Sequence, residues 1–177
     1  MTADAPPSAR PHRSTPRETG PDAEARAAEP RAANINPGTG LATDYLNHFN
    51  EAIMLLEMIP DMPDCAEDFL AWCPLSYREH FLASNFKARD LAISAYESAD
   101  PDVRLKFEQI TDTMTSILSA VSAAMRQVSL DKTRATLANR AVGWLKPLVG
   151  AAGAVINGDS EADPEGADAN VDYIMTH

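Results

Sequence analysis

Aromatic side chains, cysteines and the alternating pattern typical of β-strands are all scarce in this chain of 177 residues. Aromatic residues make up 6% of the sequence, although hydrophobic residues make up 45%. Alanine, leucine and methionine therefore supply most of the apolar volume, and this mixture favours helices over strands. No β-branched run alternates with polar residues, and no hairpin dipeptide joins two such runs. We therefore predict an all-α protein.

The chain has only two cysteines, Cys65 and Cys73. Within one short helix their Cα atoms would be separated by ~12 Å, whereas a disulfide needs about 7 Å or less. No cysteine and histidine spacing resembles that of a zinc site. We expect two buried free thiols, as in a reducing compartment. Because residues 1–20 also contain no apolar signal core, we expect a cytoplasmic location.

Motifs of nucleophilic catalysis and nucleotide binding are also missing. There is no Gly-x-Ser-x-Gly elbow, and neither cysteine has a histidine at a recognisable spacing. The glycines Gly38 and Gly40 are not followed by Gly-Lys-Ser/Thr, so residues 36–40 predict a turn and not a phosphate-binding loop. We therefore name no catalytic residue and no cofactor, and we lean towards a protein that is not an enzyme.

The net charge of −11 is unevenly distributed along the chain. Residues 1–40 are neutral, residues 41–128 carry −8, residues 129–156 carry +3, and residues 157–177 contain six acids and no Lys or Arg. An acidic body repels polyphosphate, so we expect no nucleic-acid binding. The basic segment 129–156 is expected to pack against the acidic body.

Composition divides the chain into three parts. Residues 1–40 are rich in Pro, Ala and Arg and have almost no large apolar side chains, so we predict a disordered arm. Residues 157–177 predict an acidic, flexible tail, whose apolar cluster at residues 171–175 is either a docking peptide or a frayed end. Residues 41–156 are predicted to form one helical-bundle domain.

Helix signals within residues 41–156 predict four long helices and one short one. A wide apolar face predicts a helix over residues 41–59. A short helix follows between residues 64 and 73, with Asp64 as its cap. The capping box formed by Ser76 and Glu79 begins a helix that is expected to reach about residue 97.

The fourth and fifth predicted helices carry the strongest periodicity. After the Asp100–Pro101 cap, apolar residues recur at spacings of four and three up to residue 128, as in the seam of a bundle. Ser129 is expected to cap the last helix, in which Pro147 predicts a kink or a break near residues 143–147. Its apolar stretch, residues 141–156, is shorter than the roughly 20 residues that span a bilayer, so we predict no membrane span.

The last two helices carry more apolar seam than a five-helix unit needs. We therefore predict a cytoplasmic interaction or regulatory protein that binds a protein partner, or a second copy of itself, through this surplus. The candidate interface residues are Met114, Ile117, Val121, Trp144, Leu145 and Leu148.

The alternative function is a helical-bundle phosphotransfer or metal-binding protein that uses His80 or His48. On the first helix, Asp44, His48 and Glu51 share one face and could bind a metal ion together with Glu79 or His80. A solvated polar face explains the same pattern. Ala83 and Ser84 leave space beside His80, so it is the better phosphoryl acceptor, whereas acidic neighbours surround His48. A partly exposed structural histidine is the competing interpretation of His80.

Overall fold

The computed structural model describes residues 34–159, and there the chain is helical, as predicted. No strand occurs in this range, and one isolated β-bridge joins Ile35 to Ala42. The predicted disorder of residues 1–33 and 160–177 lies outside the described residues. The elements, in order, are a short 3₁₀ helix η1 (Thr43–Tyr45), α2 (Leu46–Met58), α3 (Cys65–Ala71), α4 (Tyr77–Ala83), α5 (Arg89–Glu97), α6 (Pro101–Gln127) and α7 (Asp131–Asn157).

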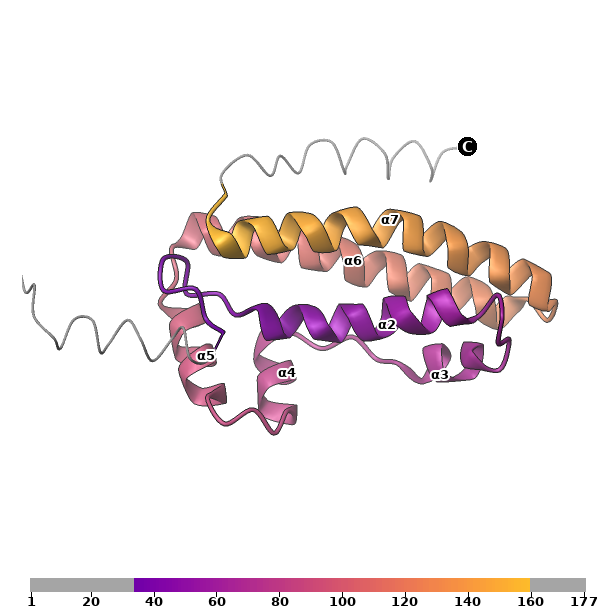
Figure 1. Cartoon of the computed structure of the whole chain (residues 1–177), viewed down its shortest axis with the longest axis horizontal. Coiled ribbons are helices and arrows are strands. Elements are labelled where there is room, and N and C mark those ends of the chain that lie inside the picture. The colour runs from indigo at the N-terminus through magenta and orange to yellow at the C-terminus, as the bar shows by residue number, and fades with distance from the viewer. Residues whose placement is uncertain (1–33, 160–177) are drawn as a thin grey trace, which may run out of the picture.

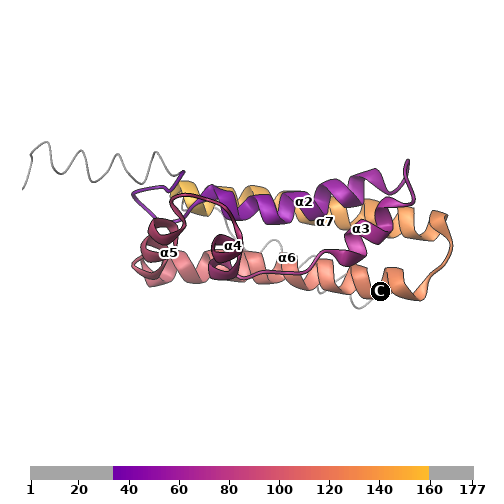
Figure 2. The same cartoon turned by 90° about the horizontal axis from the view of Figure 1, so that it is seen from below.

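Three helices, α2, α6 and α7, run side by side along the length of the molecule (Figure 1). The helices α6 and α7 form a hairpin joined by residues 128–130, and α2 packs against α7. The short helices α3 and α4 lie on one side of this trio, between α2 and α6 (Figure 2). They are connected by an extended segment, residues 72–76, which we call the 72–76 link.

Residues 76–97, predicted as one long helix, form two short helices instead. The capping box of Ser76 and Glu79 is present and begins α4, but the helix ends at Ala83. Ser84 ends it because its hydroxyl donates to the Phe81 carbonyl (3.0 Å) and accepts from the Phe86 amide (3.4 Å). A serine side chain that bonds to nearby backbone competes with the helical hydrogen bonds. The side of the bundle beside α2 and α6 is therefore formed by short helices and not by one long helix.

The helices α6 and α7 test the other boundary predictions. Asp100 caps α6 as expected, through hydrogen bonds to the amides of Asp102 and Val103. Ser129 does not cap α7, because the N-cap position is Leu130 and no side chain bonds there. The helix also continues through Pro147 without a break. Pro147 lies on the exposed side, where water can satisfy the carbonyl that a proline leaves without a partner.

The folded unit includes residues that precede residue 41. Ile35 is buried in the core, and residues 36–40 form the predicted turn, in which Gly40 has a φ of +73°. The buried Thr39 hydroxyl donates to the Ile156 carbonyl at 2.7 Å, which ties this turn to the end of α7. Residues 34–40, assigned above to the N-terminal arm, thus belong to the folded unit.

Two further predictions concern the cysteines and the apolar part of α7. Cys65 is buried and Cys73 is exposed, so the expectation of two buried thiols was wrong for Cys73. The reason is that α3 ends at Ala71 and the chain is extended from Trp72 onwards. Among the described residues, no helix combines the length and apolar character needed to cross a membrane.

Candidate functional site

The predicted interface residues lie mainly inside the molecule. Met114, Ile117, Val121, Leu145 and Leu148 are 0–8% exposed and belong to the hydrophobic core, and Trp144 packs partly buried against it. Since α7 and α3 both pack on α6, and α2 packs on α7, the chain itself covers the seam that seemed surplus. These residues therefore do not form a contact surface in this structure.

The structure does bring the two predicted histidines together. His48 lies on α2 and His80 on α4, and their ring centroids are 5.8 Å apart. Tyr45 packs against both rings, at centroid distances of 6.4 Å from His48 and 5.6 Å from His80. The histidine pair thus lies where α2 meets α4 and the 72–76 link.

His48 holds the 72–76 link with both its side chain and its backbone. Its Nε2 accepts a hydrogen bond from the Leu75 amide at 3.0 Å, which requires the neutral imidazole. The Trp72 ring stacks on the His48 ring with centroids 4.6 Å apart, and the indole N–H donates to the His48 carbonyl at 3.2 Å. The side chain of His48 is buried, with 7% of the residue exposed. His48 is therefore a structural anchor.

The electrostatics of the pair favour neutral rings. Burial and, to a smaller extent, the neighbouring His80 together lower the pKa of His48 to about 4. Burial also lowers the pKa of His80, although the Asp44 carboxylate and carbonyl oppose this shift. Among the described residues, the Asp44 Oδ2 atom is buried without a hydrogen-bond partner. A proton on His80 would thus have a nearby carboxylate, whereas a proton on His48 would face only His80 and aromatic rings.

Two tyrosines connect the same elements. The Tyr45 hydroxyl donates to the Leu75 carbonyl at 2.7 Å, and the Tyr77 hydroxyl accepts from the Ala42 amide at 2.9 Å. Burial is the largest cause that raises the pKa of both phenols, in Tyr77 to about 12. Both hydroxyls therefore stay protonated at neutral pH and act as fixed links between η1, the 72–76 link and α4.

The predicted metal-binding set is only partly assembled. Asp44 lies close to His80, but Glu51 is exposed and Glu79 bonds to the Ser76 amide in the capping box. These bonds hold the pKa of Glu79 below its usual range. Within residues 34–159, no group of three or more His, Cys, Asp or Glu side chains is arranged to hold a metal ion. His48 is also poorly placed as a phosphoryl acceptor, because it is buried and its Nε2 is already bonded.

An open groove lies between the 72–76 link and α6. Its volume is about 230 Å³. Arg126, which is exposed, donates from Nη2 to the Leu70 carbonyl at 2.7 Å. The lining residues are Trp72, Pro74, Leu118, Ser119, Ser122, Ala123 and Arg126. Sequence analysis did not find this groove, since it joins segments more than 40 residues apart; the small side chains on the surface of α6 were the only available signal.

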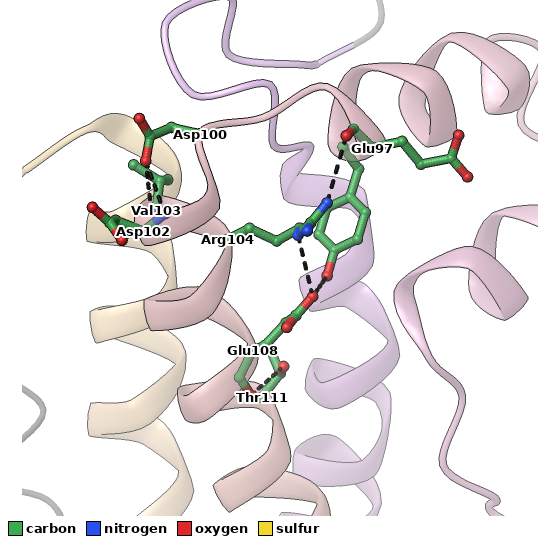
Figure 3. A network of polar contacts seen from close by, with 8 residues as sticks. Glu97, Asp100, Asp102, Val103, Arg104, Glu108 and Thr111 are labelled. Carbon is green, nitrogen blue, oxygen red and sulfur yellow. Dashed lines mark hydrogen bonds and ion pairs between the residues drawn. The ribbon is translucent and has the colours of Figure 1, made fainter.

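A second polar network fixes the corner between α5 and α6 (Figure 3). The Tyr96 hydroxyl donates to the Glu108 carboxylate, and Arg104 lies 3.7 Å from that carboxylate and above the Tyr96 ring. Burial and the bond to Glu108 raise the pKa of Tyr96. The Tyr96 ring also stacks on the Tyr77 ring, with centroids 4.1 Å apart, so this network contacts α4 through its first residue.

Comparison with known proteins adds no relative: the chain matches no protein-family model, no curated protein sequence and no solved structure.

Proposed function

We propose that this chain is a non-enzymatic interaction protein that binds a segment of a protein partner in the groove between the 72–76 link and α6. The observation that supports this proposal is the groove itself. Its lining includes the apolar side chains of Trp72, Pro74 and Leu118 and an exposed arginine. Tryptophan and arginine are the residue types that contribute most often to the energy of protein interfaces.

The size of the groove favours a peptide side chain over a small molecule. Its volume of about 230 Å³ lies below the roughly 300–1,000 Å³ of typical ligand pockets. One large apolar side chain of a partner can fill such a hollow while the rest of the partner segment lies along the surface. The partner supplies an apolar anchor.

Arg126 and Trp72 indicate the rest of the partner's chemistry. The Leu70 carbonyl takes one donor of the Arg126 guanidinium, and a guanidinium has five. The remaining donors fit a carboxylate, which arginine can bind with two parallel hydrogen bonds. Trp72 is already held by His48, so little side-chain entropy is lost on binding. The expected partner segment therefore combines an apolar side chain with an Asp or Glu nearby.

Selection from a displayed random peptide library on the full chain at pH 7 tests the proposal. We expect the enriched peptides to carry an apolar side chain close to an acidic one. Ala123→Trp fills the groove and should weaken their binding at least ~10-fold, since the anchor loses its place. Arg126→Gln should weaken binding about 10-fold through loss of the charged pair.

The matched control is Ala120→Trp, because Ala120 is also exposed on α6 but does not line the groove. It should bind the peptides as the unmodified chain does. Enriched peptides that bind Ala123→Trp and the unmodified chain equally would contradict the proposal. A dimer in sedimentation that Ala123→Trp dissociates would contradict a foreign partner and make the occupant a second copy.

A further inference from the structure

We propose that His48 and His80 form an acid-sensitive latch, which holds the 72–76 link against α2 when both rings are neutral and releases it when they are protonated. The proposal concerns regulation, and its consequence for binding rests on the proposed function of the groove. The latch itself is argued from the contacts of His48, which bonds to the link, and from the charges beside it, including His80.

The first step is the hydrogen bond from the Leu75 amide to His48 Nε2. Protonation converts this acceptor into a donor, so two N–H groups would then face each other across 3.0 Å. The bond is lost and replaced by repulsion. A partly buried amide that loses its acceptor is unfavourable unless it reaches water, and Leu75 gains fuller access to water when the link moves away from α2.

The second step concerns the charges around the pair. The rings that pack around His48 are those of Tyr45 and Phe49 from its own stretch of chain, Trp72 from the link, and His80 from α4. The carboxylates that act nearby do so on other groups: Asp44 acts on His80 and Tyr77, while Glu79 and Asp112 act on Tyr45. A first proton on His80 is balanced by Asp44, but a second on His48 is opposed by His80. The second proton therefore favours the released link, in which water can solvate the charged His48 ring.

The third step connects the latch to the groove. Trp72 stacks on the His48 ring and also lines the groove. Pro74 lies on the same link. When the link leaves α2, the groove loses the part of its lining that these two residues form. Acid should therefore lower the affinity of the groove for its peptide.

The size of the effect follows from the pKa of His48. With an ordinary pKa of 6.5 in the released state and about 4 in the latched state, the ratio of latched to released molecules falls about 20-fold between pH 7 and pH 5. Protonation of His80, whose pKa is also lowered, adds to this change. Both histidines therefore bind protons at a higher pH in the released state than in the latched state.

Amide hydrogen exchange of the full chain, followed by NMR at pH 7 and pH 5, tests the latch without any ligand. We expect the Leu75 amide to be far less protected than the amide of Leu145 in α7, and its protection factor to fall about 20-fold at pH 5. His48→Gln keeps an acceptor at a similar position but cannot titrate. In this variant the Leu75 protection factor should therefore fall only a few-fold between pH 7 and pH 5. His80→Gln is the matched control, because His80 does not bond to Leu75, and it should keep most of the pH-dependent fall in the Leu75 protection factor.

Two results of the exchange experiment would overturn the latch. One is a Leu75 protection factor that does not change with pH. The other is protection at Leu75 equal to that at Leu145 at both pH values, because the bond would then break only when the whole chain unfolds.

Peptides selected at pH 7 test the connection to the groove separately. Their affinity should fall at pH 5 for the unmodified chain and hold for His48→Gln. Equal affinities at both pH values, with the expected exchange at Leu75, would refute control of the groove by the latch. If no groove-binding peptide exists, the proposed function fails while the exchange result still decides the latch.

Discussion

The α6–α7 hairpin is held by apolar packing, whereas the side formed by α3, the 72–76 link and α4 combines apolar packing with hydrogen bonds from several buried or half-buried side chains. The hairpin buries aliphatic and aromatic side chains along its whole length, and its buried residues are almost all apolar. The other side consists of seven-residue helices that are positioned by His48, Tyr45, Tyr77 and Trp72. Hydrophobic packing has no direct dependence on pH, whereas a bond to a neutral histidine does. The comparison predicts that acid acts on the side that contains His48 and has little direct effect on the α6–α7 hairpin.

The largest expected effect is on the α6–α7 hairpin. Leu145 in α7 is 0% exposed and lies in the common core, so Leu145→Ala should lower the free energy of unfolding by about 3 kcal/mol through loss of buried area and creation of a cavity. Urea titration monitored by circular dichroism measures this. Leu105→Ala, at a position 54% exposed, is the control and should change stability by less than ~0.5 kcal/mol. Equal losses in the two variants would refute the assignment of Leu145 to the core.

A smaller effect is expected from acid on the other side. Because the pKa of His48 in the folded chain is about 4 and its ordinary value is 6.5, the unfolded chain binds the proton first. The stability that neutral His48 contributes is therefore fully present above pH 6.5 and is lost as the pH falls towards 4. Between pH 7 and pH 5 the loss from His48 alone is about 2 kcal/mol.

Urea titrations at the two pH values measure this loss, and His48→Gln supplies the comparison. The variant should lose about 2 kcal/mol less than the unmodified chain between pH 7 and pH 5. Equal losses would mean that His48 titrates normally in the folded chain and that the two sides do not differ in the way described.

The smallest effect sharpens the description of the α6–α7 hairpin. Gly150 lies on the exposed side of α7, and a Cβ added there would meet nothing within 4 Å. Gly150→Ala should raise the free energy of unfolding by about 0.5–1 kcal/mol, since alanine favours the helix and restricts the unfolded chain. A loss of stability that grows with protein concentration would show instead that this face of α7 packs against another copy.

Local chemistry in the sequence predicted the features that depend on neighbours along the chain. The caps of α4 and α6, the turn at residues 36–40 and the apolar seam of α6 are confirmed. Predictions failed where two local signals competed. Ser84 bonds to nearby backbone and ends α4, although the apolar pattern continues. Pro147 was expected to kink or break α7 near residues 143–147, and the helix continues through it without a break, with Pro147 on the exposed side.

The candidate site was harder to predict because it depends on which faces meet. Residues such as Val121 and Leu148 are apolar, as an interface requires, but an apolar stripe does not reveal whether the chain itself covers it. His48 and His80 were both named as candidates, yet their proximity across 32 positions is a property of the packing. The acceptor role of His48 also depends on the path of the 72–76 link.

The sequence by itself determined that residues 34–159 are mainly helical, where α4 and α6 begin, and which stripe of α6 is apolar, since these follow from interactions within a few turns of one helix. Tertiary structure alone decided that the seam is closed within the chain, that two histidines meet, and that Trp72 separates them from an open groove. Burial and the approach of distant groups set these outcomes, and both arise only when the helices pack together.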